Sequence, residues 1–163
     1  MIKRSLAVVS IIALAAAGMI LAGCNKAETP APVVEVKSEW LTDYPKAQAL
    51  AKEANKAILL DFTGSDFCIG CQSLKKQVWS TPEFAEFAKK NLVLVELDFP
   101  MDLPQPEELK KANQALESQF KVVGYPTIIM VDASGKEIFR DEGYDDSPAN
   151  KYIAKLRDAL TKR

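Results

Sequence analysis

The chain has no histidine and only three cysteines among its 163 residues, and both shortages limit its chemistry. A structural zinc site takes four ligands, usually Cys and His, so one cysteine pair without histidine disfavours zinc. Without an imidazole, a proton transfer near neutral pH must use another group. We therefore expect neither a metal ion nor a bound organic cofactor.

The sequence also lacks a block of basic residues, since 21 Lys and Arg are balanced by 22 Asp and Glu. This composition disfavours nucleic acid as a partner, because its phosphates attract clustered positive charge. There is no internal repeat. The residues that follow position 23 are numerous enough for one domain with its own core, and too few for two.

No apolar run is long enough to favour a membrane span. The longest, Leu6–Leu21, has 16 residues and follows two basic residues, Lys3 and Arg4. It ends in Leu21-Ala22-Gly23-Cys24, which resembles the lipobox of bacterial lipoproteins. In that family the signal is cut before the Cys, which then carries lipid. An ordinary signal peptide cut nearby, or an uncleaved anchor helix, is the alternative.

The lipobox resemblance divides the N-terminal part of the chain in two. Residues 1–23 are the expected signal peptide, and residues 24–37 are the lipidated Cys24 followed by a polar, Pro-containing tether. An edge strand at Val33–Val36 is the alternative for part of this tether. Asn25 is not the Asp that retains lipoproteins at the inner membrane in the enterobacterial sorting rule that this segment resembles, so the outer membrane is favoured.

A pair of cysteines follows a continuous apolar run. Ala57–Phe62 predicts a buried strand, and Cys68-Ile69-Gly70-Cys71 comes after a short loop at the start of a predicted helix. Unpaired N–H groups and the helix dipole favour a thiolate at a helix N-terminus, where Cys68 lies. Cys71 lies one turn further on the same face, so the two sulfurs can form a disulfide. The pattern predicts a redox-active dithiol, with two core cysteines as the alternative.

From Trp40 onward, helical and strand patterns alternate, which predicts an α/β fold with a mixed central sheet and helices on both faces. Pro45 begins the first helix, the helix opened by Cys68 continues to Val78, and Ser80–Glu83 begins another. Asp132–Gly135 predicts a hairpin turn. The expected order is α-β-α-β-α-β-β-α. The four predicted strands are Ala57–Phe62, Leu92–Phe99, Pro126–Val131 and Lys136–Asp141.

Together these motifs resemble the thioredoxin superfamily: C-x-x-C at a strand–helix junction, Gly124-Tyr125-Pro126-Thr127 opening the third strand, and a hairpin followed by Gly143. Phe62–Cys68 and Leu97–Pro100 are more closely similar to bacterial thioredoxin-like proteins of exported compartments. Those proteins are related to the reductase domain of the membrane thiol:disulfide electron transporter. The resemblance implies a thioredoxin-like fold over residues 38–163.

The resemblance also assigns roles to individual residues. It makes Cys68 the attacking thiol and Cys71 the resolving thiol, which releases the reduced substrate from a mixed disulfide. Pro126 matches the family's cis-proline beside the disulfide, where it leaves the backbone of Tyr125 free to pair with a substrate strand. Phe67 occupies the aromatic position before the first Cys, where it either contacts substrate or only packs.

Asp61 ends the predicted strand, where the family often has a buried acid that moves the proton of the resolving Cys. Burial would raise the pKa of such an acid, whereas a strand-end Asp could instead point into solvent or cap the next turn. Phe62–Phe67 is one residue longer than the corresponding thioredoxin loop. Glu96 stands where ordinary thioredoxin carries a Lys. If both carboxylates point inward, they repel each other and raise each other's pKa. If Glu96 points outward, it has no consequence for Asp61.

These features predict a lipid-anchored thiol–disulfide oxidoreductase that faces the periplasm. The strongly oxidising relatives place a His between the cysteines, but Ile69 and Gly70 supply no basic side chain, so a reductant or weak isomerase is favoured over an oxidase. The expected partners are protein disulfide substrates, a membrane electron donor, and the bilayer through Cys24. We expect a monomer. The alternative is a non-catalytic docking module, and its copper-binding form is disfavoured because such sites add a His.

Overall fold

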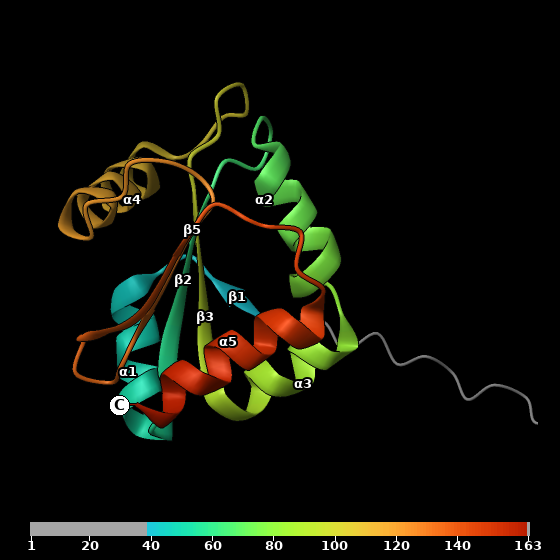
Figure 1. Ribbon diagram of the computed structural model, residues 1–163. Coiled ribbons are helices and arrows are strands. Elements are labelled where there is room, and N and C mark those ends of the chain that lie inside the picture. The colour runs from blue at the N-terminus through green and yellow to red at the C-terminus, as the bar shows by residue number, and fades with distance from the viewer. Residues whose placement is uncertain (1–38, 163) are drawn as a thin grey trace, which may run out of the picture. The chain divides into compact units, whose positions relative to one another are not determined.

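The computed structural model describes residues 39–162, so the predicted signal peptide, Cys24 and the tether with its alternative strand Val33–Val36 lie outside them. The described chain forms one five-stranded mixed sheet in the order β1-β3-β2-β4-β5 (Figure 1). β2 is parallel to β3 and antiparallel to β4, and β4 and β5 form an antiparallel hairpin. The strands are β1 (Trp40–Leu41), β2 (Ala57–Thr63), β3 (Leu92–Asp98), β4 (Thr127–Val131) and β5 (Glu137–Glu142).

Helices cover both faces of the sheet, as the sequence predicted (Figure 1). α1 (Tyr44–Ala54) and the end of α4 (Glu107–Gln119) pack against one face. The other face carries α2 (Ile69–Leu74), the π-helical turn η1 (Lys75–Trp79), α3 (Pro82–Asn91) and α5 (Ala149–Thr161). Among residues 39–162, no helix is both long enough and apolar enough to span a bilayer.

The four predicted strands are confirmed with end shifts of at most one residue, but the expected element order omits β1. This two-residue strand pairs parallel with β3, with Trp40 opposite Leu94 and Leu41 opposite Val95. Two residues are too few to show an alternating pattern. Residues 40–41 are a strand because they pair with the edge of β3, and not because of a pattern in their own sequence.

The central strand β2 is buried along its whole length. Because side chains alternate across a strand, Ile58, Leu60 and Phe62 enter the core under α1, whereas Ala57 and Leu59 enter the core under α3 and α5. Asp61 follows Leu59 by two residues, so the alternation directs its carboxyl to the face that carries α2 and η1.

The helix that starts beside the cysteines ends in a widened turn. Ser80 N–H donates to the carbonyl of Lys75 at 2.9 Å, a bond across five residues. The adjacent side chains of Val78 and Trp79 in this turn are both buried. The predicted continuation to Val78 is therefore confirmed, with this change of pitch. α3 then begins where predicted, with Thr81 as its N-cap.

Candidate active site

The two cysteines form a disulfide at the start of α2, with their Cα atoms 5.2 Å apart. Cys68 is the N-cap residue, and the helix begins at Ile69, one residue later than predicted. Cys68 Sγ accepts the N–H of Cys71 at 3.1 Å, which is the contact expected to favour a thiolate in the reduced protein. Cys68 is 9% exposed and Cys71 is 4% exposed, so both residues are buried and Cys68 is slightly the more accessible.

The loop before Cys68 holds Phe67 in place. A Cβ added at Gly64 would lie 2.5 Å from the Phe67 ring, so this ring packs directly over the glycine. The Phe67 side chain is otherwise exposed, and its ring meets the Tyr125 ring edge-on at a centroid distance of 6.3 Å. One side of the Phe67 ring therefore packs on the protein and the other faces solvent, and its contact with substrate stays a prediction.

The Tyr125–Pro126 peptide bond is cis, as the resemblance implied. A Cβ added at Gly70 would lie 3.3 Å from Pro126 Cδ, so the proline ring lies against the turn between the two cysteines. Within residues 39–162, neither the N–H nor the C=O of Tyr125 makes a hydrogen bond. Gly70, which lacks a side chain to crowd this approach, belongs to the site as well, and its place between the cysteines is the signal for it in the sequence.

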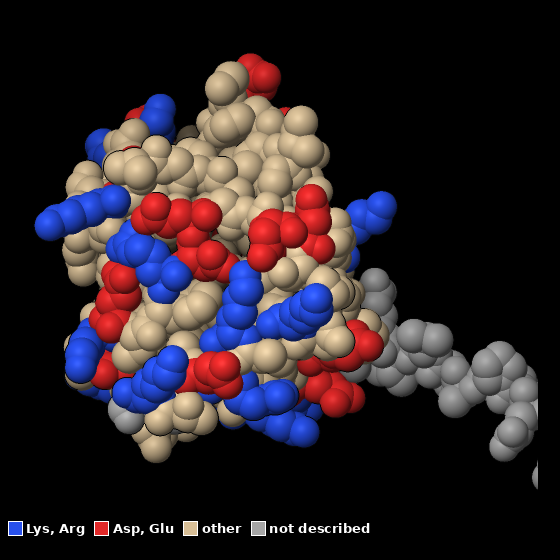
Figure 2. Space-filling view, in the orientation of Figure 1, with Lys and Arg blue, Asp and Glu red and all other residues tan. Residues whose placement is uncertain are grey.

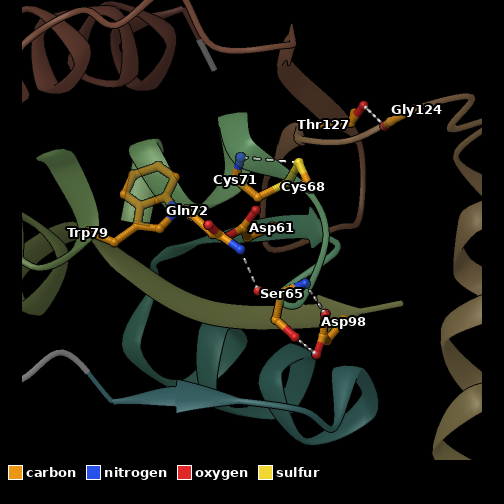
Figure 3. Close-up of a disulfide and its surroundings, with 9 residues drawn as sticks. All are labelled: Asp61, Ser65, Cys68, Cys71, Gln72, Trp79, Asp98, Gly124 and Thr127. Atoms are coloured by element: carbon orange, nitrogen blue, oxygen red, sulfur yellow. Dashed lines mark hydrogen bonds between the residues drawn. A yellow bond between two sulfur atoms is a disulfide. The ribbon is translucent and has the colours of Figure 1, made fainter. Parts of the chain in front are cut away.

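Asp61 lies buried on the α2 side of the sheet and accepts a hydrogen bond from Trp79 Nε1 to Oδ2 at 2.9 Å (Figure 3). Its other oxygen, Oδ1, has no partner among the described residues. Burial raises the pKa of Asp61 to about 7, and repulsion from Glu96 adds to the rise, while the Trp79 bond opposes it. Near neutral pH this carboxyl can therefore take or give a proton.

Glu96 lies directly opposite Asp61 in the parallel register of β2 and β3. Its carboxylate forms an ion pair with Lys75 of η1 at 3.3 Å and is partly exposed. Glu96 thus shares the sheet face of Asp61, and Lys75 offsets only part of its effect on Asp61. Lys75 supplies from the helix the positive charge that thioredoxin carries on the strand.

Trp79, like Gly70, is a site residue that was not predicted from the sequence. It stands 18 residues from Asp61, and only the π turn brings its indole to the carboxyl. No local pattern in the sequence marks such a turn. Its indole also packs on Phe84 at a centroid distance of 4.5 Å, so Trp79 links the buried acid to the core.

A family model described as a thioredoxin-like domain matches residues 44–160. The chain belongs to the thioredoxin-like family. This thioredoxin-like chain is 37% identical over 132 residues to the disulfide bond reductase DsbH of Chlamydia pneumoniae, which covers 81% of this chain and 78% of that protein. A solved structure of DsbH oxidoreductase superposes with a TM-score of 0.75 and 35% identity, over 84% of this chain and 94% of that chain.

A second relative is much longer. The thiol:disulfide interchange protein DsbD of Cronobacter sakazakii is 33% identical over 129 residues, which is 78% of this thioredoxin-like chain and 21% of DsbD. These relatives and the Cys68–Cys71 pair make the chain a thiol–disulfide oxidoreductase of the DsbH and DsbD type.

Proposed function

We propose that this protein reduces protein disulfides in the cell envelope, held at a membrane by lipid on Cys24. The observation that carries the proposal is the Cys68–Cys71 pair at the start of α2, on the sheet face where a buried Asp61 has a pKa near 7. A dithiol needs a low-pKa attacking sulfur and a base for the second sulfur. This site offers a candidate for each role.

The first step joins the enzyme to its substrate. The Cys68 thiolate attacks one sulfur of a substrate disulfide, so that a Cys68–substrate bond forms and the substrate S–S bond breaks. The other substrate sulfur leaves as a thiolate and takes up a proton. Tyr125 and Pro126 line this position beside the cysteines, and the unpaired backbone of Tyr125 is free to bond a substrate strand.

The second step frees the substrate. Asp61 takes the proton of Cys71, whose thiolate attacks Cys68 Sγ and forms the intramolecular disulfide found in the structure. The second substrate sulfur leaves as a thiolate and takes up the proton that Asp61 received from Cys71. In total the substrate gains two electrons and two protons, and the dithiol loses them. A thiol donor, which we place in the membrane, then reduces the disulfide again.

The residues around the two cysteines favour electron flow from this protein to its substrate. Ile69 and Gly70 supply no positive charge between them, and the whole chain has no histidine. A weakly stabilised thiolate makes a dithiol a better reductant. The name of the relative DsbH, a disulfide bond reductase, supports the same direction for this chain.

The redox potential tests this direction. We expect a value below roughly −200 mV, on the scale that runs from thioredoxin to the periplasmic oxidants. Equilibrating the domain in glutathione buffers of known ratio and quantifying the two forms by alkylation measures it. A value near about −120 mV would contradict a reductase and make the protein a disulfide donor.

The anchor has its own test. Cys24 lies outside the described residues, and its lipidation is proposed from the lipobox alone. A Cys24→Ala protein should appear in the soluble fraction after signal cleavage, whereas the wild type should fractionate with outer membranes on a density gradient. A cleaved Cys24→Ala protein that stays wholly with membranes contradicts lipid anchoring.

A further inference from the structure

The loop between β3 and α4, residues 99–106, is tied to the loop that precedes Cys68. The Asp66 carboxylate accepts three consecutive backbone N–H groups, from Met101 at 3.0 Å, Asp102 at 2.7 Å and Leu103 at 3.1 Å. These bonds, that from Met101 foremost, hold the pKa of Asp66 below its usual range, so the carboxylate is charged at neutral pH. One side chain therefore fixes the path of three residues that lie 35 or more positions away.

A second tie joins the same two loops. The N–H and Oγ of Ser65 donate to the Asp98 carboxylate at 2.9 and 2.7 Å. The carbonyl of Asp98 in turn accepts the side-chain amides of Gln105 and Asn113 at 3.1 and 2.9 Å. Hydrogen bonds therefore hold the 99–106 loop at both of its ends. The loop projects at the end of the domain where α2 begins (Figure 1).

The ties hold apolar side chains out in solvent. Met101 is 69% exposed and Leu103 is 57% exposed. Ile69, between the cysteines, is 79% exposed. Figure 2 shows that the end of the domain with these loops carries few charged side chains, whereas most lie across the lower half of that face. Exposed apolar groups gathered in one area mark an interaction surface.

The exposed apolar surface is continuous with the disulfide. Phe67 precedes Cys68 and meets Tyr125, and the Tyr125 ring stacks on Phe99 at a centroid distance of 5.0 Å. Phe99 begins a groove of about 500 Å³ that runs along the loop. Its loop side is apolar, formed by Phe99, Pro100, Met101, Leu103 and Pro104, whereas Gln105 and the α4 residues Glu107, Lys110 and Gln114 make the other side polar.

We infer that this surface, which we call the loop wall (Phe99–Pro104), is a substrate-docking site that selects polypeptide disulfides whose cysteine is flanked by apolar residues. The inference rests on the proposed reductase function and names its substrate class. When the cysteine of an extended substrate segment lies at Cys68, the side chains that flank it pass Phe67 and Tyr125 and reach the groove along the loop wall. Asp66 is a positioning residue, because it acts only through the loop that it holds.

The test compares three substrates in steady-state assays of the soluble domain. Two are disulfide-bonded peptides of one design, with either leucine or serine on both sides of the attacked cysteine. The third is hydroxyethyl disulfide, which is too small to reach the loop wall. The measured quantity is the ratio of kcat/KM for the leucine peptide to kcat/KM for the serine peptide.

The decisive variant is Met101→Ser with Leu103→Ser, which removes two exposed side chains and no hydrogen bond. The ratio should fall about tenfold, mainly through KM, because partly burying two such side chains on binding gives an effect of that size. Leu50→Ser is the matched control, since Leu50 is an exposed apolar residue on α1, and it should keep the wild-type ratio.

Asp66→Asn tests the positioning role separately. The ratio should fall severalfold, because the amide offers the three N–H groups one neutral acceptor in place of a carboxylate. Asp102→Asn removes one negative charge from the loop that Asp66 holds and should keep the wild-type ratio, since no hydrogen bond to the Asp102 side chain occurs within residues 39–162.

Two results would contradict the proposal that the loop wall docks substrate. In one, the Met101→Ser/Leu103→Ser protein keeps the wild-type ratio. In the other, it loses activity by the same factor on all three substrates. A wild-type domain that reduces none of the three, hydroxyethyl disulfide included, overturns the proposed reductase function itself and the docking site with it.

Discussion

Replacing Cys68 with serine should abolish disulfide reduction, by roughly a thousandfold or more, because the remaining thiol of the pair, Cys71, is the less accessible one and has no partner to resolve a mixed disulfide. Replacing Cys71 with serine should instead stall the reaction after its first step. Cys68 would still attack the substrate, but nothing would resolve the mixed disulfide. Turnover of a peptide disulfide with a thiol reductant measures the first effect, and non-reducing gels of envelope extracts measure the second.

The two variants control each other. The greater accessibility of Cys68, and the Cys71 N–H that its sulfur accepts, assign it the first attack. The double variant Cys68→Ser/Cys71→Ser should trap no substrate, which distinguishes covalent capture from non-covalent association. If Cys68→Ser formed the stable mixed disulfides and Cys71→Ser did not, the two roles would be reversed.

Replacing Asp61 with asparagine should slow disulfide reduction about 10- to 100-fold near pH 7, because it removes the base that takes the Cys71 proton. The deficit should shrink toward pH 9, where a thiol with an ordinary pKa of about 8.5 ionises unaided. Asparagine keeps an acceptor for Trp79 Nε1, so the fold should persist. A pH–rate profile from pH 6 to 9 measures this, and equal rates throughout would remove Asp61 from the mechanism.

The same variant should reveal the cost of the buried charge. The folded protein raises the pKa of Asp61 from 3.8 to about 7, so between these pH values the carboxyl takes up a proton when the chain folds. The free energy of unfolding of the wild type therefore falls as the pH rises through this range. A shift of this size corresponds to at most about 4 kcal/mol. Asparagine resembles the protonated form, so Asp61→Asn should match the wild type near pH 4 and exceed it by about 2–4 kcal/mol at pH 8.

Urea unfolding of the oxidised domain at the two pH values measures this difference. Asp102→Asn is the control, because Asp102 is exposed and its replacement should leave the pH dependence unchanged. Equal stability of Asp61→Asn and wild type at pH 8 would mean that the carboxylate is solvated when ionised. The Trp79 bond and the Lys75–Glu96 pair would then compensate its charge far better than their positions suggest.

The sequence by itself determined the parts of the site that are local along the chain. Ala57–Phe62 reads as a buried strand because every side chain is apolar except Asp61, and the strand forms as expected. Cys68 and Cys71 are one helical turn apart, so their spacing alone allows the disulfide. Gly124–Thr127 marked the place of the cis-proline, although only the family resemblance supplied the cis geometry.

Helix faces were harder to assign from the pattern. A helix starting at Pro45 could present several apolar stripes, and the structure buries Tyr44, Ala47 and Ala51 while Leu50 stays exposed. In α4 the buried residue is Asn113, whose amide bonds the Asp98 carbonyl. Periodicity places residues on a common face, but the neighbouring elements decide which face is covered.

Only the tertiary structure decided which distant residues meet. Asp61 finds Trp79 through a π turn, Glu96 finds Lys75 across the sheet and helix, and Asp66 holds a loop 35 residues further on. Helical and strand periods, caps and turns arise from interactions over a few residues, so a sequence displays them directly. Contacts between separate elements depend on register and packing, which the whole chain sets at once. The dithiol could be predicted for that reason, whereas the surroundings that tune its acid and shape its substrate surface could not.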